Sequence, residues 1–141
     1  MSRSAAVALL ALIGAFGPAQ AEMLVVKADL SAAQEAPPTD SKGKGTLKGA
    51  YDTTSKTLTY SVTYSELTGA ATAAHFHGPA ATGKNAPVIL PAAGSIASPI
   101  EAKAVLDDTQ AKALTEGMLY FNIHTAANKG GEIRGQISAA K

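Results

Sequence analysis

The sequence predicts an all-β domain, an antiparallel sandwich or barrel with Greek-key links and one short helix near residues 109–116. Apolar and polar residues alternate with a period of two over about seven short segments, as they do in half-buried strands. Turn-forming Gly, Pro, Asn and Asp residues separate these segments at short intervals, so consecutive strands can pair in antiparallel fashion.

Within this fold, the segment with the strongest pattern is residues 57–64, where large apolar residues alternate strictly with small hydroxyl residues. It should form a hairpin with the preceding strand around the turn at 52–55. A short apolar segment, 88–90, is expected to pair briefly inside the Ala-, Gly- and Pro-rich loop 80–95. The residues at 107–109 are typical of a helix start. The predicted strands span residues 23–30, 46–51, 57–64, 71–77, 96–106, 118–125 and 132–137.

The N-terminal residues predict a cleavable signal peptide over residues 1–21. Arg3 supplies a positive start, residues 5–16 are almost entirely apolar, and Ala19-Gln20-Ala21 has the small-x-small pattern of a cleavage site. The apolar segment is shorter than the roughly 20 residues of a membrane-spanning helix, which makes a retained anchor the weaker alternative. We therefore expect one domain over residues 22–141, periplasmic or secreted, with no membrane insertion after cleavage.

The composition argues against several function classes. The formal net charge is +1 and falls to zero without Arg3, whereas nucleic acids and anionic membranes attract proteins with a clustered positive excess. No nucleic-acid partner is therefore expected. The chain has no cysteine, which excludes thiol catalysis and thiolate metal ligands. No Ser-His-Asp arrangement or obvious acid–base pair of carboxylates is evident.

The three histidines are the candidate metal ligands. His75 and His77 lie two residues apart on a predicted strand, so their imidazoles project side by side, opposite the apolar face. His124 holds the same kind of position on a later strand. If the two strands are neighbours, the imidazoles form an open three-histidine site for copper or zinc. In the alternative interpretation, His75 and His77 are hydrogen-bonding surface residues and His124 packs under a loop.

A metal-bound imidazole needs a partner for its second ring nitrogen. Glu35, Asn122 and Glu132 are the candidates for this supporting role. Arg134 shares a strand face with Glu132 and could hold a carboxylate through two hydrogen bonds. The alternative is that Glu132 and Arg134 form a solvated pair on the surface of the sheet.

Four segments of the chain carry a family resemblance: 32–38 (AAQEAPP), 74–80 (AHFHGPA), 117–125 (GMLYFNIHT) and 131–136 (GEIRGQ). Together they resemble the CHRD domain, a module found as repeats in chordin and singly in many exported bacterial proteins. The resemblance extends from about residue 25 to 137 and implies an all-β, immunoglobulin-like or barrel-like module, but it implies little about activity. The histidine spacing is also similar to that of the copper ligands of copper–zinc superoxide dismutase. The chain lacks the fourth copper histidine, the bridging histidine and the zinc aspartate of that enzyme.

Three functions follow from these observations. The leading hypothesis is an exported binding protein that holds Cu(II), or otherwise Zn(II), through His75, His77 and His124, because the Irving–Williams order favours copper. The second is a metal-free interaction or structural module with an extracellular protein partner. The third is a copper-dependent redox enzyme, since an open metal position can support such chemistry.

Overall fold

In the part of the chain that the structure describes, nine antiparallel strands form one continuous sheet in the order β5-β4-β7-β8-β1-β2-β3-β6, and β9 pairs with β1 beside this path. The structure, a computed structural model, describes residue 17 and residues 20–141. The strands are β1 (Met23–Ser31), β2 (Lys44–Asp52), β3 (Thr57–Ser65), β4 (Ala71–His77), β5 (Val88–Pro91), β6 (Ile100–Val105), β7 (Tyr120–Thr125), β8 (Ile133–Gln136) and β9 (Ser138–Ala140). The two helices are the 3₁₀ turn η1 (Ala32–Gln34) and α1 (Asp108–Thr115).

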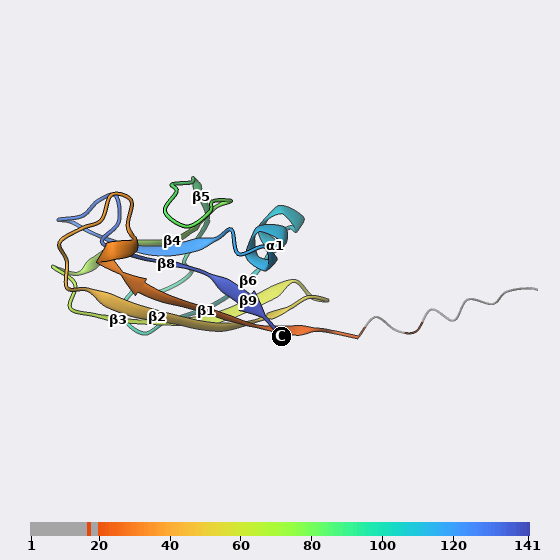
Figure 1. Cartoon of the computed structure of the whole chain (residues 1–141). Helices are drawn as coiled ribbons and strands as arrows, with labels where there is room; N and C mark the ends of the chain where they lie inside the picture. Colours follow the sequence, from red (N-terminus) through yellow and green to blue (C-terminus); the bar gives the residue numbers. More distant parts are fainter. Residues whose placement is uncertain (1–16, 18–19) are drawn as a thin grey trace, which may run out of the picture.

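The sheet curls on itself into a half-barrel with two layers (Figure 1). Strands β5, β4, β7 and β8 form one layer, and β9, β1, β2, β3 and β6 form the other. The end strands β5 and β6 pair with only one neighbour each, so among the described residues the sheet does not close. The all-β, sandwich-like fold expected from the sequence is therefore confirmed.

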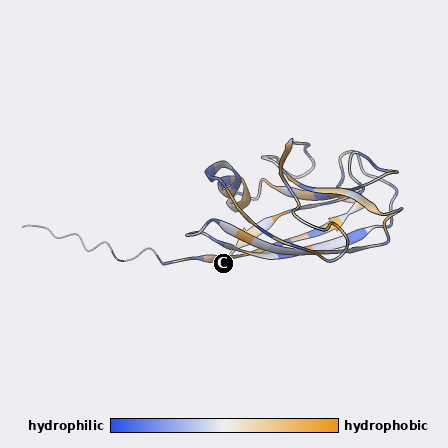
Figure 2. Ribbon diagram, turned by 180° about the vertical axis from the view of Figure 1, so that it is seen from behind, coloured by the Kyte–Doolittle hydropathy of each residue, from blue (hydrophilic) through white to orange (hydrophobic). Residues whose placement is uncertain are grey.

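An aromatic cluster in the core joins the two layers. Tyr60 of β3 packs edge-on against Phe76 of β4, with ring centroids 5.0 Å apart, and Phe76 lies 4.8 Å from Phe121 of β7. All three rings are buried. Figure 2 shows apolar residues recurring along the strands of both layers, as expected when alternate side chains point into the space between them.

Most of the predicted elements are confirmed. β2 and β3 form the expected hairpin, and the short segment from Val88 pairs with β4. The N-cap of α1, Asp107, accepts a hydrogen bond from the backbone N–H of Gln110, whose side chain accepts one from the backbone N–H of Asp107. This reciprocal capping box fixes where the helix begins.

The strand predicted over residues 96–106 is shorter in the structure, where β6 begins at Ile100. The residues before it bind β3 through single contacts instead of a ladder: the Tyr64 hydroxyl donates to the Ile96 carbonyl, and the Tyr64 N–H donates to Ser98 Oγ. Pro99 has no N–H to contribute to a ladder. Because of these two features, β6 begins at Ile100 and not at residue 96.

The predicted signal peptide falls largely on residues 1–16 and 18–19, which lie outside the described residues, so it stays a prediction. In the described part of the chain, neither helix is long and apolar enough to cross a membrane.

Candidate metal centre

The fold places the three histidines together because β4 and β7 are neighbouring antiparallel strands. Their register sets His124 opposite Ala73 and His75 opposite Asn122. Nδ1 of His75 lies 3.1 Å from Nε2 of His124, and one ring nitrogen from each of the three histidines lies within 4.8 Å of the other two. The sequence could not show that these strands are adjacent, and the structure brings the three predicted ligands together.

His124 is held in one orientation by the turn after β7. Its Nδ1 lies 2.8 Å from the carbonyl oxygen of Lys129. Because a carbonyl only accepts hydrogen bonds, Nδ1 carries the proton in the neutral ring, and the lone pair of Nε2 points toward His75. The second ring nitrogen of His124 is thus supported by a backbone carbonyl, whereas the candidates that the sequence offered for this role were all side chains.

His75 is partly exposed, and its ring centroid lies 4.9 Å from that of His124 and 5.6 Å from that of His77. Burial lowers its pKa, and the nearby rings of His124 and His77 lower it further. The neutral ring, which is the form that binds metals, is therefore favoured near neutral pH. Two ligands at about 2 Å from a tetrahedral metal lie about 3.3 Å apart, so the His75–His124 pair already has a suitable separation.

His77 is buried, and both of its ring nitrogens have protein partners. Nδ1 lies 2.9 Å from the carbonyl oxygen of Ala86, and Nε2 lies 3.0 Å from Oδ1 of Asn122. The ring also stacks on Tyr120, with centroids 4.8 Å apart and planes 5° from parallel. Burial lowers the pKa of His77 against the opposing effect of these hydrogen bonds. His77 can bind a metal only by giving up one of its two partners.

Arg134 of β8 makes several contacts on the polar side of the neighbouring strands β4, β7 and β8. Its Nε donates to Oε2 of Glu35 over 3.1 Å, and both side chains are almost fully buried. The guanidinium carbon lies 3.8 Å above the centre of the Tyr120 ring. Burial raises the pKa of the Glu35 carboxyl, while the charge of Arg134 and its hydrogen bond lower it. Arg134 therefore links β8 to the segment after η1, next to His77.

The segment of residues 78–87, here called the strap, covers this polar face. Arg134 donates to the Lys84 carbonyl and to Oδ1 of Asn85, over 3.1 and 2.6 Å. The Ala86 carbonyl accepts from His77 and also from the Tyr120 hydroxyl, 3.2 Å away. The strap thus depends on the same side chains that surround His77.

Glu132, a supporting residue proposed from the sequence, makes its hydrogen bonds to residues other than the three histidines. It is completely buried and accepts hydrogen bonds from the side chains of Ser41, Thr68, Thr125 and Asn128, and from the Thr68 backbone. Burial opposes its ionisation, but hydrogen bonds from Ser41, Thr125 and Thr68 outweigh that cost and lower its pKa to about 2. Glu132 joins the loops around the end of β7.

The alternative of a solvated Glu132–Arg134 pair is wrong. Both residues are buried, and Arg134 pairs with Glu35 instead. Sequence reasoning missed Tyr120, although its period-two spacing from Asn122 and His124 placed it on the same face. It also missed the carbonyls of Ala86 and Lys129, for which side-chain patterns carry no signal.

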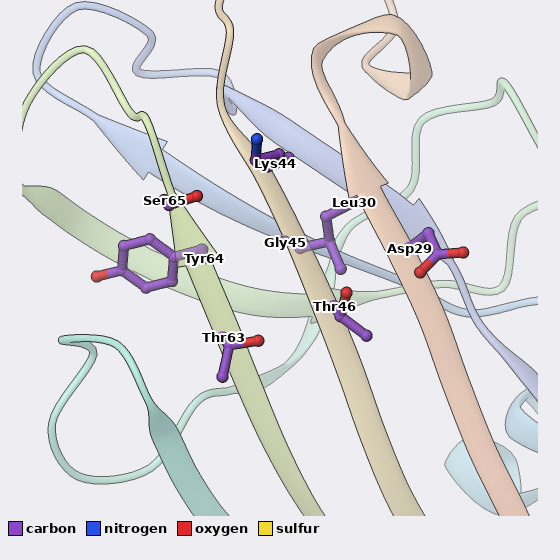
Figure 3. A pocket seen from close by; sticks show the side chains of 8 residues that line it. All are labelled: Asp29, Leu30, Lys44, Gly45, Thr46, Thr63, Tyr64 and Ser65. Atoms are coloured by element: carbon purple, nitrogen blue, oxygen red, sulfur yellow. The ribbon is translucent and has the colours of Figure 1, made fainter.

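A separate concavity of about 510 Å³ lies over β1, β2 and β3. Figure 3 shows the side chains of Asp29, Thr46 and Thr63 on these three neighbouring strands. No histidine lines this concavity, so it is not part of the candidate metal centre.

The comparisons with known proteins concern the family alone. A family model described as the CHRD domain matches residues 26–137, nearly the whole chain. Comparison with curated proteins and with solved structures finds no match.

Proposed function

Because the chain belongs to the CHRD-domain family, we propose that it is an exported member which binds one transition-metal ion through His75, His77 and His124. The distance of 3.1 Å between Nδ1 of His75 and Nε2 of His124 is the observation that carries the proposal. Cu(II) is the favoured ion and Zn(II) the second, because imidazoles bind both and copper stands higher in the Irving–Williams order.

The site would serve storage, delivery or sensing of the metal. His75 and His124 are the close pair, whose Nδ1–Nε2 hydrogen bond the metal would replace, and His77 completes the set by exchanging its bond to Asn122 or Ala86 for the metal. All three ligands are neutral imidazoles, so a bound divalent ion keeps its positive charge and an open position for a further ligand.

Calorimetric titration of Cu(II) and Zn(II) into chelator-treated protein tests the proposal. We expect one ion per chain, with Cu(II) binding more tightly, and nitrogen hyperfine structure in the electron paramagnetic resonance spectrum of the copper form. His75→Ala combined with His124→Ala should remove this binding, because it deletes the close pair.

Thr72→Ala is the matched control, since Thr72 is exposed on β4 next to these positions and should not affect binding. Copper stoichiometry and affinity that are the same in the double histidine variant as in the natural chain would contradict the proposal.

The engagement of both His77 nitrogens favours a second candidate, a metal-free module that binds an extracellular protein. In that case the imidazoles only hold β4, β7 and the strap together. A metal that binds the folded state raises the unfolding temperature with concentration, whereas a metal-free module shows no such shift at micromolar Cu(II) or Zn(II).

We further propose that residues 1–21 direct export to the periplasm or the exterior and are then removed. The small residues Ala19 and Ala21 support cleavage after Ala21. N-terminal sequencing of the protein recovered outside the cytoplasm should give Glu22 first, and an N-terminus at Met1 in that fraction would contradict this part of the proposal.

A further inference from the structure

The edge strand β6 offers an unpartnered row of backbone hydrogen-bonding groups. β6 lies at one end of the sheet and pairs only with β3 in the described part of the chain. The backbone N–H of Leu106 donates to the carbonyl of Lys56, directly beyond the pair Thr57–Val105. Because hydrogen bonding alternates along an antiparallel ladder, the N–H and C=O groups of Glu101, Lys103 and Val105 point away from β3.

The side chains at these same three positions are exposed. Glu101 and Lys103 share the outer face of the sheet, and within the described residues neither takes part in an ion pair. Val105 is 72% exposed, the highest fraction among the exposed large hydrophobic residues. The other end strand, β5, is only four residues long and ends at Pro91, which has no N–H.

We propose that β6 pairs with β6 of a second copy of this chain, in antiparallel fashion and with Ala102 opposite its own copy. A two-fold axis perpendicular to the sheet places the outer faces of both copies on the same side. Odd-numbered residues of one β6 can therefore lie only opposite odd-numbered residues of the other, and even-numbered residues opposite even-numbered ones. With Ala102 at the centre, Glu101 faces Lys103 of the other copy twice, and Val105 faces Pro99.

The neighbouring registers are disfavoured by charge. A shift in one direction places Glu101 opposite Glu101, and a shift in the other places Lys103 opposite Lys103. Like charges directly opposite each other destabilise a strand pair, and opposite charges stabilise it. The sequence of β6 is therefore self-complementary in one register, which supports a second copy as the occupant of this edge. A strand contact of this size belongs to the weak, transient class of interfaces.

Sedimentation equilibrium over a wide range of protein concentration and at low salt tests the proposal. The natural chain should dimerise reversibly, and added salt should weaken the dimer because the charged pairs are exposed. Glu101→Lys and Lys103→Glu should each weaken dimerisation by roughly tenfold or more, since each turns two attractive pairs into repulsive ones.

Two further experiments restore the attraction between positions 101 and 103 without restoring the natural sequence. The double variant E101K/K103E should dimerise like the natural chain, and an equimolar mixture of the two single variants should form a heterodimer. Lys42→Glu, at an exposed position in the loop before β2 and beyond the end of the β3–β6 ladder, is the control for net charge and should leave dimerisation unchanged. A natural chain that stays monomeric at all concentrations, or single variants that dimerise equally well, would overturn the proposal.

Discussion

At the scale of single residues, the buried side chain of Glu132 organises the polar loops around the end of β7, and it is not a predicted metal ligand. Glu132 is an ionised carboxylate held by hydroxyl, amide and backbone donors, with no cationic partner among its hydrogen bonds. Gly131 precedes it with φ at +123°. Together they fix the turn whose Lys129 carbonyl orients His124.

Glu132→Gln should lower the free energy of unfolding at pH 7 by about 2 kcal/mol, because the amide cannot accept all of these hydrogen bonds. The folded pKa of about 2 lies below 4.5, the ordinary value for a glutamate carboxyl. The contribution of the carboxylate is therefore complete above the unfolded pKa and is lost as pH falls from about 4.5 toward 2. Urea denaturation at neutral and acidic pH measures this.

The difference between the two proteins should shrink as the pH approaches 2. Asp40→Asn, at an exposed position, is the control and should change little at either pH. A pH-independent difference for Glu132→Gln would contradict the assignment of a lowered pKa.

Gly131→Ala should be strongly destabilising, by about 2 kcal/mol or more. A methyl group there would lie 2.4 Å from Oε1 of Glu35 and 2.6 Å from Nδ2 of Asn122, and the positive φ disfavours any side chain. Gly69→Ala is the matched control, since nothing lies within 4 Å of its added methyl group. Thermal unfolding of the two variants gives the comparison, and equal melting temperatures would contradict the expected crowding.

At the scale of elements, the capping box of α1 gives a local test. Asp107→Ala should cost about 1 kcal/mol because it removes the acceptor for the Gln110 N–H. Thr109→Ala, at an exposed position in the first turn, should cost much less. Chemical denaturation of both variants checks the prediction, which fails if the two values are the same.

Arg134 determines how the strap is held. Arg134→Lys should destabilise the protein by about 3 kcal/mol, because a lysine cannot reproduce the three separate donors and leaves Glu35 buried without its partner. Hydrogen exchange should become faster at the Ala86 amide, which bonds to the Tyr120 hydroxyl. Unchanged protection of Ala86 would show that the strap is held by other contacts.

Local elements were predictable from the sequence because their signals lie within a few residues. The alternation in residues 57–64 and the helix-start residues at 107–109 correspond to β3 and to the start of α1. The start of β6 was placed too early because Tyr64 binds Ile96 and Ser98 from another strand. Such contacts depend on the tertiary structure, and a period-two pattern cannot report them.

The candidate site was predictable only in part for the same reason. Period two placed His75 and His77 on one face of a strand, but the adjacency of β4 and β7 spans more than 40 residues of chain and has no local signal. The burial of Glu132 and Arg134 was also missed. The alternation of polar residues in the sequence predicts that their face is exposed to solvent. In the structure, the strap and the loops cover that face.

At the scale of the whole molecule, β4 contributes to the core with one face and to the polar histidine cluster with the other. Phe76 packs into the aromatic cluster of the core, while His75 and His77 point to the polar side. Phe76→Ala should cost about 3–5 kcal/mol in the free energy of unfolding, because it leaves a cavity between Tyr60 and Phe121.

The copper binding proposed above, measured well below the melting temperature of this variant, should be largely retained, since the imidazoles and their carbonyl partners are unchanged. Circular dichroism gives the stability and calorimetry gives the affinity. A stability close to that of the natural chain would mean that the core collapses around the missing ring.

The two ends of the open sheet differ in their capacity for growth. An aggregate that extends strand by strand needs a free edge on each side of every copy, and the short β5, which ends at Pro91, is a poor template. Pairing through β6 would therefore consume the favourable edge that the described part of each chain offers. Assembly would stop at two copies, and the half-barrel, although open, would not propagate into a fibre.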